Sequence, residues 1–520
     1  MVPRPRPRGD GGAQPVRRRS GSPTGGLTVA GGARVVASGW GWRHAGRKAW
    51  AVAELSFDIE AGERVLVLGA SGAGKSTLLA GIAGLLGGDD EGETTGELRI
   101  DGVDARSARG RSGLVLQDPD AAAVFSRVGD DVAFGCENLG IEREEIWRRV
   151  RRSLDAVGLG VDLDRRTAEL SGGEKQRLAI AGVLAMEPRV ILLDEPTANL
   201  DPAGVLDVRD AIERTVVREG TTLVVVEHRT EIWADLMTRV IVLDPSGGVL
   251  ADGEPDAVFA QEGDRLAAAG VWVPRHPIGM PLALDAPAGA VVLEADGLAI
   301  GRPGAPVVRS AIDLSIPQGH ATVVVGPNGA GKSTLALTLA GLIPEREGLL
   351  TGAPSLAGRR GQRPAQWSSR ELLTRIGTVF QDPEHQFITA TVRDELAVGP
   401  KALGLGPAET EERVDALLAA LGLGALALAN PFTLSGGQKR RLSVGTVLAS
   451  RPAVMVLDEP TFGQDRVSWI RLVELLRAEV AAGTTVVAVT HDAGVVAHLG
   501  ESVVELTGAS QGVALRGRAA

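Results

Sequence analysis

Short runs of apolar residues recur along the chain and predict its secondary structure. Uninterrupted runs at 65–68, 190–193 and 223–226 predict buried strands. Residues 53–59 alternate between apolar and polar side chains, which is typical of a half-buried strand, and residues 178–186 predict an apolar helix. Because strands alternate with helices, we expect α/β domains that are built on a mostly parallel sheet.

The same series of segments occurs twice in the chain. The lysines of two glycine-rich loops are offset by 257 (332 − 75), and a strand-ending glutamine recurs at an offset of 264 (381 − 117). A Leu-Ser-Gly-Gly segment and an Asp-Glu pair recur at that same offset (435 − 171 and 458 − 194), and a histidine recurs at an offset of 263 (491 − 228). One internal duplication, with about seven additional residues after the second glycine-rich loop, explains all five spacings.

Each half contains a glycine-rich loop, Gly-x-x-x-x-Gly-Lys-Ser, between an apolar strand and a helix. Backbone N–H groups of such a loop surround phosphate oxygens, and the positive end of the following helix attracts them. The lysine reaches the β- and γ-phosphates, and the serine is a ligand for Mg²⁺. The loops consist of Gly69, Ala70, Ser71, Gly72, Ala73, Gly74, Lys75, Ser76 and Thr77, and of Gly326, Pro327, Asn328, Gly329, Ala330, Gly331, Lys332, Ser333 and Thr334.

Polar residues stand where the buried strands end. Asp194 and Glu195 follow the run at 190–193, and in an open parallel sheet ligand chemistry is placed at that edge. Ser171 precedes a helix that it can cap, and the two glycines after it expose backbone N–H groups.

Composition limits the classes of function. The net charge of −10 argues against a nucleic-acid binder, and no apolar run approaches the ~20 residues that span a bilayer. The single cysteine, Cys136, excludes disulfides and cysteine-based metal sites within one chain. Residues 1–20 carry six arginines and predict a disordered tail, with weak binding to anionic lipid as the alternative.

These motifs together resemble an ABC-type ATPase over residues 27–510, and the Leu-Ser-Gly-Gly segments are the specific part of the resemblance. The resemblance implies two tandem P-loop NTPase domains, each with a mostly parallel sheet core, an antiparallel β subdomain and a helical signature subdomain. We expect a tail at 1–26, a first domain at 27–262, a linker at 263–290, a second domain at 291–513 and a tail at 514–520.

The resemblance also implies roles for single residues, with ATP and Mg²⁺ as the bound species. Asp194 and Asp458 hold Mg²⁺, together with Ser76, Ser333, Gln117 and Gln381. Glu195 and Glu459 are the general bases, Gln117 and Gln381 sense the γ-phosphate, and His228 and His491 contact it. The signatures, Ser171, Gly172, Gly173 and Ser435, Gly436, Gly437, each face the phosphate loop of the other half. Trp42, or else Trp40, stacks on adenine in the first site, whereas the second half has no aromatic residue there.

Further motifs resemble the energy-coupling-factor ATPases, which drive uptake of vitamins or of cobalt and nickel. Gln-Asp-Pro follows both glutamine strands, the segment Asp-Val-Ala-Phe-Gly-Cys-Glu-Asn-Leu-Gly begins at Asp131, and Val-Glu-His-Arg ends at Arg229. In that group the region after the glutamine receives a coupling helix from a separate membrane subunit. The resemblance therefore implies a transport motor on the cytoplasmic face of the membrane, with a transmembrane coupling protein and a substrate-binding membrane protein as partners.

Three other classes of ABC ATPase are the alternatives. Tandem ABC proteins that act on ribosomes have a long, charged helical linker, whereas residues 263–290 are short and contain four prolines. DNA-repair ABC ATPases carry zinc cysteines or coiled-coil inserts. Fused sugar-import ATPases usually have an altered second phosphate loop, whereas residues 326–334 are intact. The transported substrate is not encoded in this chain, because the membrane subunits select it.

Overall fold

The computed structural model describes residues 31–88, 91–118, 122–198, 200–217, 220–283, 289–358, 361–507 and 513–516. The chain divides into two compact units, residues 1–263 and 264–520. The tail predicted at 1–26 lies outside the described residues, as do the last four residues of the tail predicted at 514–520.

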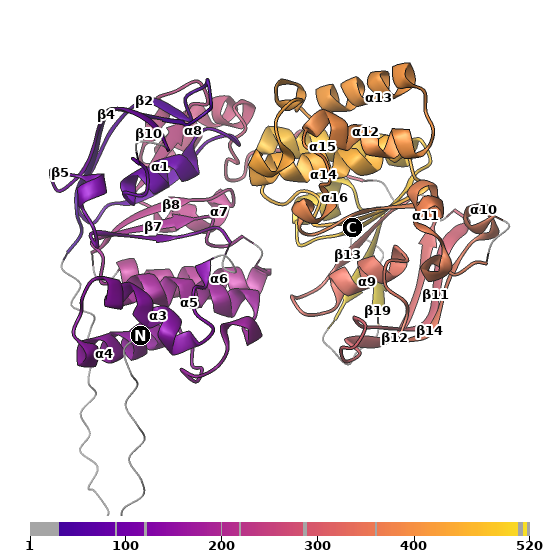
Figure 1. The fold of residues 1–520 in the computed structure, drawn as a ribbon, viewed down its shortest axis with the longest axis horizontal. Coiled ribbons are helices and arrows are strands. Elements are labelled where there is room, and N and C mark those ends of the chain that lie inside the picture. Colours follow the sequence, from indigo (N-terminus) through magenta and orange to yellow (C-terminus); the bar gives the residue numbers. More distant parts are fainter. Residues whose placement is uncertain are drawn as a thin grey trace, which may run out of the picture. The chain divides into compact units, whose positions relative to one another are not determined.

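The first unit contains two sheets (Figure 1). An antiparallel sheet has the strand order β2-β1-β4-β5, and a six-stranded sheet has the order β10-β9-β3-β8-β7-β6. Strands β9, β3, β8, β7 and β6 of the second sheet are parallel, and β10 is antiparallel to β9. The strands are β1 (Val35–His44), β2 (Val52–Ile59), β3 (Arg64–Leu68), β4 (Gly92–Ile100), β5 (Val103–Asp104), β6 (Ser112–Val115), β7 (Val190–Asp194), β8 (Thr222–Val226), β9 (Arg239–Leu243) and β10 (Val249–Gly253).

The helices of the first unit lie on both sides of its parallel sheet. Figure 1 shows α1 on the side of the antiparallel sheet and α3, α4 and α5 together on the other side of β7 and β8. The α-helices are α1 (Lys75–Ile82), α3 (Val128–Asn138), α4 (Arg143–Ala156), α5 (Gly172–Ala185), α6 (Pro202–Ile212), α7 (Thr230–Trp233) and α8 (Pro255–Ala268). The 3₁₀-helices are η1 (Ala105–Ser107), η2 (Thr167–Glu169) and η4 (Ala234–Leu236), and η3 (Glu213–Val217) is a short π-helix.

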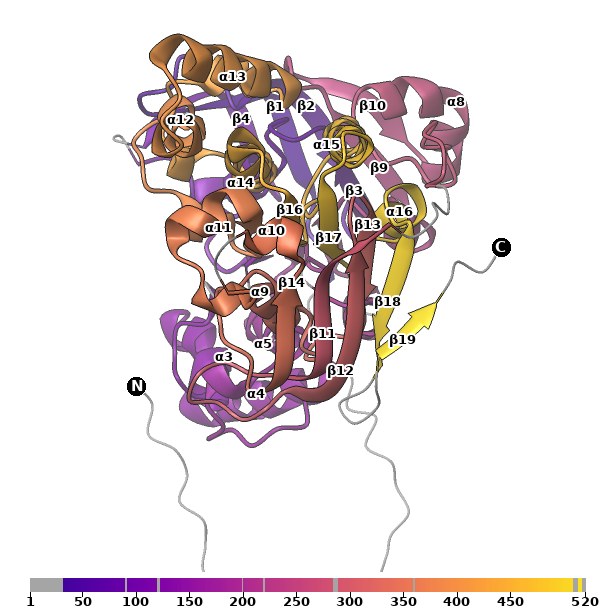
Figure 2. The ribbon, with the colours of Figure 1, turned by 90° about the vertical axis from the view of Figure 1, so that its right-hand side faces the viewer.

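The second unit repeats this plan. Its antiparallel sheet has the order β12-β11-β14, whose strands lie side by side in Figure 2, and its larger sheet has the order β15-β16-β17-β13-β18-β19. The strands are β11 (Val291–Ile300), β12 (Arg309–Pro317), β13 (Ala321–Val325), β14 (Glu347–Gly352), β15 (Ile376–Val379), β16 (Val454–Asp458), β17 (Thr485–Val489), β18 (Ser502–Leu506) and β19 (Val513–Arg516). The helices are α9 (Lys332–Leu339), α10 (Pro354–Ala357), α11 (Ser369–Arg375), α12 (Val392–Ala402), α13 (Pro407–Ala420), α14 (Gly436–Ser450), α15 (Arg466–Ala481) and α16 (Ala493–His498), with the turns η5 (Pro364–Gln366), η6 (Pro383–Gln386), η7 (Gly424–Leu426) and η8 (Pro431–Thr433).

Alternate residues of the buried strands form different cores, because successive side chains of a strand point to opposite faces. In the second unit, Val454 and Val456 of β16 pack with α9 and the antiparallel sheet. Met455 and Leu457 pack on the other face with residues of α12, α14 and α15. The sheet is therefore buried on both sides, as its uninterrupted apolar strands indicate. The expected fold, two tandem α/β domains with an antiparallel and a helical subdomain each, is confirmed.

The segment predicted as a linker begins within α8, and its residues 264–283 pack as part of the second unit. The Trp272 ring lies edge-on to Trp469 of α15, with centroids 5.6 Å apart, and its Nε1 donates to the Gln464 carbonyl at 3.0 Å. The Ala283 N–H donates to the Ala497 carbonyl at 3.0 Å. Apolar packing and hydrogen bonds thus fix these residues to the second unit.

Candidate functional site

The first glycine-rich loop connects β3 to α1, as the sequence predicts. Gly74 has φ +85° at the start of α1, and a Cβ atom there would lie 2.3 Å from the Ala51 carbonyl, so glycine is required. Lys75 is 7% exposed, and its Nζ donates to the carbonyls of Gly69 at 2.8 Å and Ala70 at 3.1 Å. The ammonium group therefore lies inside the curve of the loop. The second loop, between β13 and α9, holds Lys332 by the equivalent carbonyls at the same two distances.

Four predicted residues of the first unit converge beside the first glycine-rich loop. Gln117 donates from Nε2 to Glu195 Oε2 at 2.7 Å, and His228 Nε2 lies 3.3 Å from Glu195 Oε1. Asp194, the last residue of β7, is hydrogen-bonded to the Ser76 side chain. Residues far apart in the sequence thus meet at the carboxyl ends of parallel strands, where the alternation of strands and helices predicts a site.

Burial and charge set the two carboxyl groups of this site apart. Burial raises the pKa of Asp194 to about 6, and the Glu195 charge adds to this rise. Burial alone would also raise the pKa of Glu195, but His228, Lys75 and Gln117 together hold that pKa below its ordinary value. Glu195 is therefore kept ionised, which its predicted role as a general base requires.

The second unit builds the corresponding site with different partners. Asp458 at the end of β16 is bonded to the Ser333 side chain. Glu459 accepts from Thr490 Oγ1 at 2.9 Å, and His491 Nε2 lies 3.0 Å from Asn328 Oδ1 but 3.9 Å from Glu459 Oε1. Burial raises the pKa of Glu459 to about 7. Among the described residues, no hydrogen bond joins Gln381 to Glu459, whereas Gln117 is bonded to Glu195.

The residue before each histidine also differs between the two units, and it was not among the predicted site residues. In the first unit it is Glu227, which is 4% exposed and accepts from the backbone N–H groups of Thr197 and His228 at 3.0 Å each. In the second unit it is Thr490, and the anchoring carboxylate comes instead from Asp492, which accepts from Thr461 Oγ1 at 2.8 Å. The change from Glu-His to Thr-His-Asp between the two halves was the available signal.

The Leu-Ser-Gly-Gly segments form helix N-termini in both units. Ser171 and Glu174 cap α5 reciprocally, and Ser435 and Gln438 cap α14 in the same way, so the predicted capping role is confirmed. Within the described part of each unit, no hydrogen bond links these serines to the glycine-rich loop or to Glu195 and Glu459. Their expected role in binding nucleotide stays a prediction.

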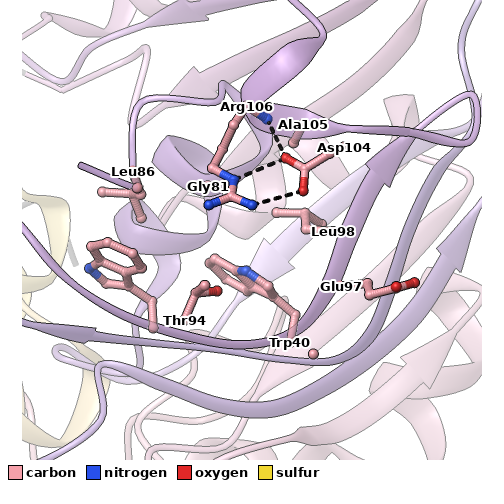
Figure 3. A pocket seen from close by; sticks show the side chains of 12 residues that line it. Trp40, Gly81, Leu86, Thr94, Glu97, Leu98, Asp104, Ala105 and Arg106 are labelled. Carbon is pink, nitrogen blue, oxygen red and sulfur yellow. Dashed lines mark hydrogen bonds and ion pairs between the residues drawn. The ribbon is translucent and has the colours of Figure 1, made fainter. Parts of the chain in front are cut away.

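The structure does not bring Trp42 to the phosphate loop. Its ring is 2% exposed, and its Nε1 donates to His44 Nδ1 at 3.1 Å. Trp40 and Trp42 line a small cavity of about 40 Å³ between β4 and α1, in which Trp40 lies near Gly81 and Leu98 (Figure 3). His44, two residues after Trp42, does reach the loop, because its Nε2 lies 3.5 Å from Thr77 Oγ1. Strand β1 therefore turns both tryptophans into the interior of the unit.

Comparison with known families gives a clear result. The family model described as ABC transporter matches residues 52–198 and 310–462, which is more than half of the chain and covers both phosphate loops. The chain belongs to the ABC transporter family. It carries two ABC cassettes and is an ATP-binding ATPase. No helix in the described ranges is both long and apolar enough to cross a membrane.

Relatives match the ABC protein over most of its length. It is 37% identical over 484 residues to a protein of Bacillus subtilis (strain 168) that bears the name HMP/thiamine import ATP-binding protein YkoD, covering 87% of this chain and 86% of the relative. It is 32% identical over 502 residues to an ABC transporter ATP-binding protein of Methanosarcina mazei, covering 87% of this chain and 84% of that one. A solved structure of ribosome-bound archaeal Pelota and ABCE1 has a TM-score of 0.63 at 20% identity, covering 91% of this chain and 78% of that one, and shows the same fold.

Proposed function

We propose that this ABC ATPase is the motor of an importer of the energy-coupling-factor type, and that it drives uptake of a vitamin or a transition-metal ion. It would act at the cytoplasmic face of the membrane through separate membrane subunits. The name of the Bacillus subtilis relative, which refers to import of HMP and thiamine, supports this class of cargo.

One observation carries the proposal: both units expose an apolar side chain at equivalent positions after the glutamine strand. Val124 is 61% exposed and Ile388 is 76% exposed. Their offset in the sequence (388 − 124 = 264) is the same as that of the two glutamines. A large apolar side chain that the fold leaves in water at the same place in both halves is suited to receive a partner.

The fold holds each of these exposed residues in place with a carboxylate. Asp131 Oδ1 accepts from the N–H groups of Val124 and Phe125, each at 2.8 Å. Glu395, at the equivalent position of the second unit, accepts from the N–H groups of Ile388 and Thr389 at 3.0 and 2.8 Å. Because two hydrogen bonds fix the backbone in each case, Val124 and Ile388 are held at the surface in a defined position. An apolar helix end of a membrane subunit fits such a surface.

The nucleotide chemistry of the proposal rests on the residues that the fold brings together. Glu195 and Glu459 would take the proton of the attacking water, and His228 and His491 would contact the γ-phosphate. The hydroxyl oxygens of Ser76 and Ser333 and the carboxylates of Asp194 and Asp458 are the hard oxygen donors that Mg²⁺ prefers, and Gln117 and Gln381 would complete the set. When bound, the ion neutralises phosphate charge.

Substitution of the exposed pair tests the importer proposal. Val124→Asp with Ile388→Asp should abolish recovery of the protein with detergent-solubilised membrane subunits in its native host, because the new charges would be buried against apolar partner surface. ATP hydrolysis by the purified protein should stay within about twofold. Leu206→Asp, at a residue of α6 that is 56% exposed, is the matched control and should still be recovered with the membrane subunits. Unchanged recovery of the double variant, or recovery of the wild type with ribosomes instead, would refute the proposal.

A further inference from the structure

A buried arginine lies behind the second phosphate loop. Arg309, the first residue of β12, is 3% exposed. Its Nε donates to the carbonyl of Ala330 at 3.2 Å, and one of its terminal nitrogens donates to the carbonyl of Thr507, just after β18. The guanidinium group therefore ties the second phosphate loop, of which Ala330 is part, to the chain just after β18.

The bond to Ala330 fixes the orientation of a backbone N–H group. The peptide bond is planar and trans, so the carbonyl of Ala330 and the N–H of Gly331 point in opposite directions. Because the carbonyl is held toward Arg309, the Gly331 N–H points away from β12. Phosphate loops bind their ligand through N–H groups that converge on it, and each misdirected N–H weakens that binding.

The first unit has no arginine at the corresponding place. Val52, the first residue of β2, is the equivalent of Arg309 (309 − 257 = 52), and Ala73 is the equivalent of Ala330 (330 − 257 = 73). Asp244 corresponds to Thr507, with the spacing of the histidines (507 − 263 = 244). All three residues line a cavity of about 240 Å³ behind the first phosphate loop. Where the second unit places a guanidinium group, the first unit thus has open space and a valine that donates no side-chain hydrogen bond.

We propose that Arg309 is a positioning residue of the second nucleotide site, and that it makes the second phosphate loop bind ATP more tightly than the first. It acts through the Ala330–Gly331 peptide and does not itself touch the nucleotide. The proposal rests on the assignment of residues 69–77 and 326–334 as phosphate loops.

Binding of ATP to one loop at a time tests the proposal. In the full chain, Lys75→Ala leaves only the second loop competent and Lys332→Ala leaves only the first, and calorimetry with Mg-ATP below the unfolding temperature measures each dissociation constant. Adding Arg309→Leu should weaken binding about tenfold in the Lys75→Ala background and leave it unchanged in the Lys332→Ala background. Adding Val52→Arg to Lys332→Ala should tighten binding at the first loop.

Conservative replacement separates positioning from general stability. Arg309→Lys keeps a buried cation with donors and should bind ATP with intermediate affinity. In the Lys75→Ala background, Arg309→Ala should regain affinity when ethylguanidinium is added, because that cation fits the space that the side chain leaves. These two variants carry the test if Arg309→Leu does not fold.

Each part of the proposal is contradicted by a different experimental result. A change of less than twofold for Arg309→Leu in the Lys75→Ala background, or an equal loss in both backgrounds, would overturn the positioning role. Failure of Val52→Arg to tighten binding would overturn the claim that the missing arginine weakens the first loop. If Lys75→Ala alone bound no ATP, the assignment of the second phosphate loop would be wrong instead.

Discussion

Glu195 and Glu459 occupy equivalent positions in the two units, but their side chains have different hydrogen-bond partners. Both have positive φ, +46° and +50°, and both donate a backbone N–H at 2.8 Å, to Val226 and Val489 respectively. The sequence predicts both glutamates because each follows a buried strand and an aspartate. It does not predict their side-chain partners, since the switch from Gln117 and His228 to Thr490 depends on rotamers and loop paths that no local pattern encodes.

Cys136 provides a test of burial at the scale of one residue. Its side chain is 0% exposed, its Sγ donates to the Ala185 carbonyl at 3.0 Å, and burial raises the pKa of the thiol from 9.0 to about 11. Because it is the only cysteine, its reaction with a chromogenic disulfide at pH 8 reports on this site alone. We expect the folded protein to react at least about a hundredfold more slowly than the protein in guanidinium chloride. Rapid reaction of the folded protein would contradict the packing of α3 on α5.

The same thiol gives the protein a specific dependence on pH. Because the pKa of the thiol is higher in the folded than in the unfolded protein, the protonated thiol contributes to the stability of the fold. This contribution is fully present below pH 9, where the unfolded thiol is still protonated, and is lost as pH rises toward 11. Between these values the free energy of unfolding of the wild type should fall by up to about 3 kcal/mol more than that of Cys136→Ala. Parallel pH profiles of the two proteins in urea denaturation would show that the thiol does not titrate differently on folding.

At the scale of the element, the first phosphate loop offers a matched pair of glycines. Gly72 and Gly74 have nearly the same φ, +86° and +85°, but a Cβ atom at Gly72 would meet nothing within 4 Å, whereas one at Gly74 would lie 2.3 Å from the Ala51 carbonyl. Gly72→Ala should therefore lower the free energy of unfolding by about 1 kcal/mol, the cost of the backbone conformation alone. Gly74→Ala should lower it by about 3 kcal/mol or more and should also abolish ATP binding at the first loop.

Denaturant unfolding and calorimetry on these two variants measure both quantities. Equal losses of stability for Gly72→Ala and Gly74→Ala would show that β2 does not approach the loop as closely as the structure has it. The comparison is informative because the backbone strain is common to both variants, so that the difference reports the contacts that a Cβ atom at Gly74 would make with Ala51 and Val52.

Elements whose pattern is local were predictable from the sequence. The strands that end at Asp194 and Val226 and the serine caps of α5 and α14 follow from apolar runs and capping residues, and the structure has them. The place of Trp42 was not predictable, because its position in the sequence matches an adenine-stacking residue while β1 turns its ring inward. Which face of a strand such as β1, which lies between β2 and β4, is buried depends on the elements that cover the sheet, and these come from distant parts of the chain.

For the whole molecule, the duplication was the most informative feature of the sequence. It predicts two α/β units with equivalent loops, strand ends and caps, and it relates Val124 to Ile388 and Val52 to Arg309 once the structure shows what these residues do. The departures from the repeat were visible in the sequence as well. Their consequence for the structure was not visible. It depends on which backbone carbonyl groups surround the arginine, and the sequence does not show this.

The central claim, that two sites with Glu195 and Glu459 as bases hydrolyse ATP, is tested most directly by steady-state phosphate release. Glu195→Gln and Glu459→Gln should each lower the rate, and the double variant should retain about 1% or less, because a general base contributes about 10²- to 10⁴-fold. Glu294→Gln, at an exposed residue of β11, should have the wild-type rate. A single variant with an unchanged rate, or a double variant that still hydrolyses ATP at the wild-type rate, would contradict the claim.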